Sequence, residues 1–221
     1  MIGVWYWSGG MSDTDLRNEA STKHFNSLLL LRKHCDRIQQ GWFRCQALVG
    51  GGRHLVDHEE CKRAFLLAEK AAKAEPDPYK QCAPVAWPIA ALFEFGFRRE
   101  AESMTNRVLD EIGNVCPNSS KACALELVVQ AAWPLGRSFR NQVVHQLFAL
   151  MNEDPFWRVR VACEEVASFL IYEKELTQLQ CELENCVDAK TVRRIQQSID
   201  MNHGHPRSDF VPIKEKMRKG K

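Results

Sequence analysis

The feature that most constrains the fold is an internal repeat, marked by dipeptides that end in proline. Three of them are evenly spaced: Asp77-Pro78, Cys116-Pro117 and Asp154-Pro155. The steps between them are 39 and 38 residues, and the eleventh residue after each proline is apolar: Ile89, Val128 and Val166. The seventh and fifteenth residues are apolar as well, and positions four apart share one face of a helix. Two helices per unit at this period predict a short α-solenoid of stacked helical pairs.

Helix signals recur from residue 13 to residue 200. Asp13 is expected to cap a helix from about 14 to 39, and Asp57 a helix over 58–75. Between them, Gly50-Gly51-Gly52 is expected to interrupt the chain, because glycine disfavours a helix interior. Further helices are predicted over 79–95, 98–112, 119–135, 138–152, 156–171 and 173–200, the last broken near Val187-Asp188. The chain lacks sustained period-two alternation, so the predicted class is all-α.

Glycines mark the turn within two of the units. Gly96 and Gly136 follow their prolines by 18 and 19 residues, where a helix end needs a left-handed residue. The third unit departs from this pattern, with Tyr172-Glu173 in place of the glycine.

The third unit, residues 154–170, resembles the HEAT repeat. Its Asp154-Pro155 turn is followed by Val159-Arg160 and then by small apolar positions. The resemblance implies that Asp154 and Arg160 contribute to a polar ladder between neighbouring repeats. It extends as periodicity over about 57–200, although the equivalent ladder pair is absent at Cys116 and incomplete at Asp77. A tetratricopeptide-like array is the second choice, since its period of about 34 residues fits less well.

The composition suggests three regions. Residues 1–12 are expected to be a disordered extension or a misassigned start, since Met11 could also initiate translation. Residues 13–200 form the helical repeat domain. Residues 201–221, with six basic and two acidic side chains, are expected to be a disordered basic tail. Nine scattered cysteines without a CxxC pair favour a reducing, cytoplasmic compartment. The longest apolar stretch is too short to cross a bilayer, so no membrane partner is predicted.

One group of side chains has the composition of a metal site. His54, Asp57, His58 and Cys61 lie close in sequence, and His58 and Cys61 share a helix face. Caps and core positions explain them more simply, so neither a metal nor any other cofactor is predicted. No catalytic motif or catalytic residue stands out, and the sequence leans away from an enzyme.

Four arginines are the candidate binding residues. Arg98 and Arg99 follow Gly96, while Arg137 and Arg140 follow Gly136, so stacked repeats would align them in a basic ridge. Such a ridge suits phosphates or an acidic partner. The alternative is that these arginines pair with nearby carboxylates at helix ends. A formal net charge of +2 for the whole chain does not favour a polyanion as partner.

The function expected from these patterns is non-catalytic. We expect a protein-interaction module or scaffold that binds another protein on the concave face of the array, built from the second helix of each pair. Trp87, Trp133 and Trp157 are candidates for lining that face, although such residues more often lie in a core. The alternative is a nucleic-acid-binding HEAT-like protein, related to DNA repair, that uses the arginine ridge and the basic tail. The alkylpurine DNA glycosylases are one HEAT-like branch of that kind.

Overall fold

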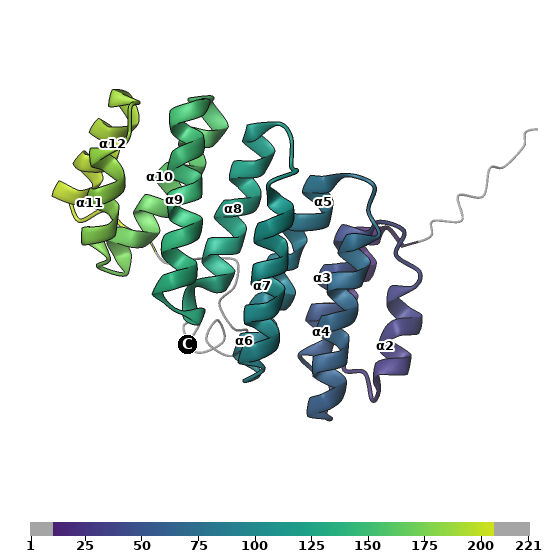
Figure 1. Cartoon of the computed structure of the whole chain (residues 1–221). Helices are drawn as coiled ribbons and strands as arrows, with labels where there is room; N and C mark the ends of the chain where they lie inside the picture. The colour runs from purple at the N-terminus through teal and green to yellow at the C-terminus, as the bar shows by residue number, and fades with distance from the viewer. Residues whose placement is uncertain (1–10, 206–221) are drawn as a thin grey trace, which may run out of the picture.

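A computed structural model describes residues 11–205, and over this range the chain is helical without strands (Figure 1). The helices are α1 (Asp13–Thr22), α2 (Leu28–Cys35), α3 (Gly41–Gly52), α4 (His58–Lys73), α5 (Pro78–Cys82), α6 (Ala86–Glu94), α7 (Arg98–Ile112), α8 (Asn118–Ala132), α9 (Arg137–Glu153), α10 (Trp157–Tyr172), α11 (Leu176–Glu184) and α12 (Ala189–Asp200). Two short 3-10 turns complete the set, η1 (Ala83–Val85) before α6 and η2 (Trp133–Leu135) after α8. The all-α prediction is confirmed for these residues.

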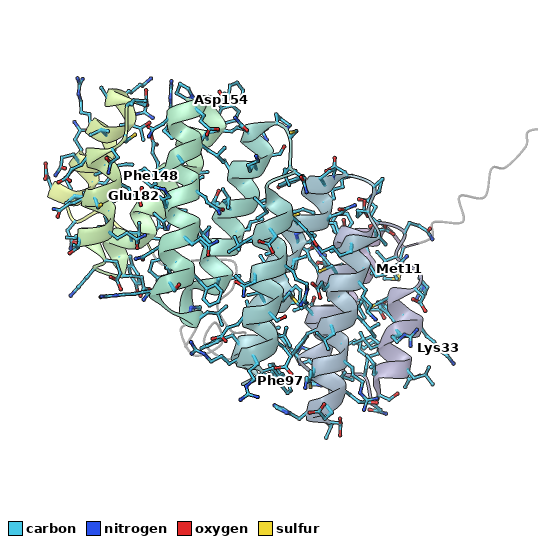
Figure 2. All side chains as sticks on the ribbon, in the orientation of Figure 1. Met11, Lys33, Phe97, Phe148, Asp154 and Glu182 are labelled. Carbon is cyan, nitrogen blue, oxygen red and sulfur yellow. The ribbon has the colours of Figure 1, made fainter. Side chains whose placement is uncertain are left out.

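The helices lie in two rows. In the first row α1, α3, α6, α8, α10 and α12 contact one another in chain order. In the second row α4, α7, α9 and α11 follow one another across the molecule (Figure 1), and α2 packs beside α4. Asp154, between α9 and α10, and Phe97, between α6 and α7, lie at opposite edges of the molecule (Figure 2). The chain therefore alternates between the rows, turning at one edge and then at the other.

The repeated apolar stripe lies in the first row. Ile89 on α6, Val128 on α8 and Val166 on α10 are each fully buried, as their equivalent repeat positions predict. Burial of such aliphatic side chains between packed helices is the main favourable contribution to the stability of the fold.

The glycine turns are also confirmed. Gly96 has φ 83° and Gly136 has φ 128°, conformations in which a side chain would be strained. In the third unit Lys174, with φ 62°, takes the same left-handed place. The backbone hydrogen bonds are alike in the first and third turns. Phe97 N–H donates to the Leu92 carbonyl at 2.8 Å, and Glu175 N–H donates to the Leu170 carbonyl at 2.9 Å. The third turn is thus the same motif without its glycine.

The prediction of one helix over 14–39 is wrong. The chain forms α1 and α2, separated by a bend in which Phe25 enters the core. Ser12 caps α1 and Ser27 caps α2, each accepting a backbone N–H three residues on. Asp13 does not cap this segment, because its carboxylate accepts the N–H groups of Gln39 and Gln40, at 3.1 and 2.9 Å. It therefore ties the start of α1 to the start of α3.

The predicted break at the three glycines is also wrong, because Gly50, Gly51 and Gly52 form the last turn of α3 and are buried. Each allows a different helix to approach. A Cβ would lie 2.4 Å from Ser21 Oγ of α1 at Gly50, 2.4 Å from Leu31 Cδ1 of α2 at Gly51, and 2.8 Å from Ala64 Cβ of α4 at Gly52. Close packing outweighs the poor helix propensity of glycine here.

Local chemistry explains where other helix boundaries differ from the predicted ones. The segment predicted over 79–95 is divided into α5, η1 and α6 around Pro84, which lacks the N–H that a continuous helix needs. The predicted break near Val187 is present, between α11 and α12. Of the two terminal segments expected to be disordered, the structure describes residues 11–12 and 201–205. Ser12 makes a capping box with Asp15, and His205 pairs with Glu165 at 2.9 Å. The rest of those predictions, residues 1–10 and 206–221, lies outside the described range.

Candidate interaction surface

The predicted arginine ridge connects neighbouring turns. Arg98 Nε donates to Glu102 at 2.8 Å, and the same guanidinium donates to the carbonyl of Leu135 in the next turn. Arg98 therefore links the α6–α7 turn to the α8–α9 turn and satisfies a carbonyl at the end of η2. It is engaged in holding two units together.

The second pair of ridge arginines converges on one carboxylate. Arg140 and Arg137 lie 3.2 and 3.6 Å from the two oxygens of Glu175, which precedes α11. The Arg140 guanidinium also lies 4.6 Å from the centre of the Trp133 ring. The Arg140 side chain is largely covered, whereas the Arg137 side chain is 78% exposed and open to solvent. Arg99 is exposed and makes no ion pair with a described residue.

The ladder residue Arg160 reaches the next unit. Its Nε lies 3.4 Å from the carboxylate of Asp188, which caps α12 by accepting the Thr191 N–H at 3.0 Å. The hydrogen bonds from Thr191 are the main cause of the lowered pKa of Asp188, and Arg160 adds to it. The structure thus pairs Arg160 with Asp188, and not with Asp154. Asp154 does not cap the following helix either, because α10 begins after Phe156 without a side-chain cap.

The metal candidates point to separate partners. His54 and His58 contact the carbonyls of Ser21 and Phe95 at 3.0 and 2.9 Å, while Asp57 accepts the Glu60 N–H at 2.7 Å as the cap of α4. Cys61 is buried, as its core position predicted. Within residues 11–205 the structure holds no group of side chains with metal-site geometry.

Most cysteine thiols are held in their protonated form. Burial raises the pKa of Cys35 to about 12, and it also raises the pKa values of Cys45 and Cys163. The thiolate is the nucleophilic form of cysteine, so these three residues are suited to packing and not to covalent chemistry.

Three aromatic rings form a group on α3, α5 and α6. The Trp42 ring of α3 lies 5.7 Å from the Tyr79 ring of α5 and 6.1 Å from the Trp87 ring of α6. All three side chains are half-buried against the core. Burial is the main cause of the raised pKa of Tyr79, and the nearby charge of Arg158 on α10 opposes it.

The start of α10 carries the most exposed apolar surface on the described first-row helices. This surface, here named the α10 patch, consists of Phe156, Trp157, Arg158 and Val161. Trp157 is 56% exposed, Phe156 47% and Val161 44%. The two rings are 6.0 Å apart, and the Arg158 guanidinium lies 5.0 Å from the Trp157 ring centre. Trp157 and Val161 are four residues apart, so they share a helix face.

Only part of this surface is predicted by the sequence. Of the three tryptophans proposed to line a face, Trp133 is buried against Phe169 at 4.3 Å, Trp87 is half-buried and Trp157 is exposed. The patch also lies on a first helix of a unit, whereas the second helices were expected to provide the binding face. Phe156 and Val161 were missed. A signal existed, because Trp157 and Val161 fall outside the buried stripe of Val159, Ala162, Val166 and Leu170.

Comparison with known proteins gives no match: no protein-family model, no curated protein and no solved structure is similar to this chain. Among residues 11–205 no helix combines the length and apolar character required to cross a membrane.

Proposed function

We propose that this chain is a HEAT-like α-solenoid that works as a non-catalytic protein-interaction module, with the α10 patch as its contact surface for a partner protein. One observation carries the proposal: Trp157, Phe156 and Val161 stand together in solvent, with Arg158 stacked on Trp157. Exposed apolar groups normally occur singly, and a contiguous patch indicates a binding surface.

The chemistry of the patch suits a protein partner. Tryptophan, tyrosine and arginine are the residue types that contribute most to binding at protein interfaces. Trp157 and Arg158 belong to these types. An arginine stacked on an aromatic ring is also oriented in advance, which lowers the entropy lost on binding.

The platform under the patch is rigid. The opposite side of α10 is anchored by Val159, Cys163 and Val166, which are fully buried between neighbouring helices. A partner therefore meets side chains held by a packed helix, and the orientation of the patch does not have to form during binding.

Copurification with patch variants tests this proposal. The tagged full chain and its Phe156→Ala/Trp157→Ala variant would be compared for recovered proteins, and the strongest recovered protein would be purified for titration. We expect affinity for it to fall about tenfold or more in the variant. Val187→Ala is the matched control, since Val187 is 71% exposed but lies between α11 and α12. Both variants should unfold within about 0.5 kcal/mol of the parent chain. Equal affinity of parent and patch variant would reject the α10 patch.

The second candidate function is nucleic-acid binding through the exposed ridge arginines Arg99 and Arg137, which, unlike Arg98, are not bonded to the Leu135 carbonyl of the next turn. It predicts saturable binding of a duplex or single-stranded oligonucleotide whose affinity falls steeply with salt, because each neutralised phosphate releases counterions. Arg99→Glu/Arg137→Glu should abolish this binding, and removing residues 206–221 should reduce its salt dependence. The interaction-module proposal predicts no such complex at physiological salt.

A further inference from the structure

A groove lies between α2 and α4. These two helices are at the end of the molecule away from α10 (Figure 1). On α4 it is lined by Arg63, Leu66, Leu67 and Lys70, which follow the i, i+3, i+4, i+7 spacing of a single helix face. On α2 the lining residues Leu28 and Arg32 are four apart and also share a face. Two helices thus turn matching faces toward one channel.

The floor of the groove is apolar. Leu66 and Leu67 are half-buried, and both pack against the core from below. Two adjoining cavities, of about 350 and 210 Å³, share Arg32, Leu67 and Lys70 in their walls. The larger one has the volume of a ligand-sized cleft. The groove therefore offers several apolar side chains of a partner a place to be buried.

The rim of the groove is basic and unpaired. Arg32, Arg63 and Lys70 are exposed, and none of them forms an ion pair with a described residue. Two carboxylates lie close: Asp36 lines the second cavity, and Glu60 accepts the Leu28 N–H at 3.1 Å. A fourth cation in the wall, Arg44, donates from Nε to the Ile38 carbonyl at 3.0 Å. The positive charge of the rim thus exceeds the nearby negative charge.

We propose that the α2–α4 groove binds an acidic amphipathic helix of a partner protein. Leucine-like side chains on one face of that helix would enter the cavities above Leu66 and Leu67. Aspartate and glutamate on its flanks would pair with Arg32, Arg63 and Lys70. This is the helix-in-groove mode of recognition, in which the apolar contacts supply affinity and the rim charges supply orientation and rate.

Charge complementarity favours this occupant over the others. A nucleic acid would satisfy the three cations but would gain nothing from the leucine floor. A second copy of the α2 surface would bring Arg32 toward like charges, which is unfavourable. The groove is also independent of the α10 patch, since the two surfaces share no residue.

A designed peptide tests the groove in the full chain. The probe is a labelled helical peptide of about 14 residues, roughly four turns, with leucine on one face and glutamate on its flanks. We expect micromolar binding by fluorescence anisotropy, weakened by raising salt from about 50 to about 300 mM. Arg63→Glu/Lys70→Glu should weaken binding about tenfold or more. Lys33→Glu is the matched control, because Lys33 lies on the outer edge of α2, away from α4 (Figure 2), and should leave affinity unchanged.

Several outcomes would overturn the groove proposal. One is an equal loss of peptide affinity in the Lys33 and the Arg63/Lys70 variants. Another is an unchanged peptide affinity in Leu67→Ser, and a third is displacement of the peptide by an equimolar oligonucleotide. A large gain in affinity on deleting residues 1–10 would also overturn it, by showing that the chain fills the groove itself. The Phe156→Ala/Trp157→Ala variant should bind the peptide normally, so failure here and failure of the proposed function are distinguishable.

Discussion

The two sides of α4 carry the same kinds of charged residue but use them differently. Toward α7, Lys62 pairs with Glu100 at 2.7 Å, Glu69 with Arg107 at 2.9 Å, and Lys73 with Glu111. The partners in each pair are 38 residues apart, so the seam repeats the period of the sequence. Toward α2, Arg63 and Lys70 have no such partner among the described residues. The seam with α7 joins two units, and the groove with α2 leaves its cations available for another molecule.

The largest expected effect comes from the face of α4 that supports both sides. Phe65 on this helix is fully buried, so Phe65→Ala should lower the free energy of unfolding by about 3–5 kcal/mol. Leu67→Ala, on the half-buried floor of the groove, should cost about 1 kcal/mol or less while weakening peptide binding. Chemical denaturation measures both. Similar losses for the two variants would mean that the groove floor is part of the core.

The far end of the molecule offers a second seam for comparison. Asp188 both caps α12 and pairs with Arg160, so Asp188→Ala should cost about 1–2 kcal/mol and more than Arg160→Ala. In a double-mutant cycle the two changes together should cost less than their sum. Asp154→Ala should add independently to Arg160→Ala. Coupling between Asp154 and Arg160 instead would restore the pairing first expected from the sequence.

The ion pairs between α4 and α7 should contribute measurably to the free energy of unfolding, and the cations of the groove should not. Arg107→Ala breaks a two-oxygen contact with Glu69, whose side chain is 13% exposed, and should cost about 0.5–1 kcal/mol. Arg63→Ala and Lys70→Ala should each change stability by less than about 0.5 kcal/mol. The ranking comes from thermal or urea unfolding under one set of conditions. A reversed order would contradict the distinction between the two sides of α4.

The smallest effect concerns pH. The hydrogen bond from Lys62 is the main cause of the lowered pKa of Glu100, whose ordinary value is 4.5. A depressed pKa in the folded state stabilises the protein above that ordinary value, and the contribution is lost as pH falls through the folded pKa. Stability should therefore decline as pH falls below about 4.5, and Glu100→Gln should flatten this decline. Arg63→Gln should not change the slope; a change as large as that of Glu100→Gln would contradict the assignment.

Local patterns in the sequence predicted much of the fold. The spacing of the prolines predicted that Ile89, Val128 and Val166 are buried, and Gly96 and Gly136 predicted the turns with positive φ. The same local logic failed at Gly50–Gly52, where propensity predicted a break and packing against three helices keeps them in α3. It failed again at residues 14–39, because two serine caps and buried Phe25 divide that segment.

By itself the sequence determined the all-α class and the burial of Ile89, Val128 and Val166, because these follow from residues within one or two helical turns. The tertiary structure decided which charged side chains form ion pairs and which stay unpaired. Arg160 pairs 28 residues ahead with Asp188, and Lys62 pairs 38 residues ahead with Glu100. Whether a cationic side chain forms an ion pair depends on distances of a few ångströms between packed helices. The spacing of residues along one helix does not give these distances.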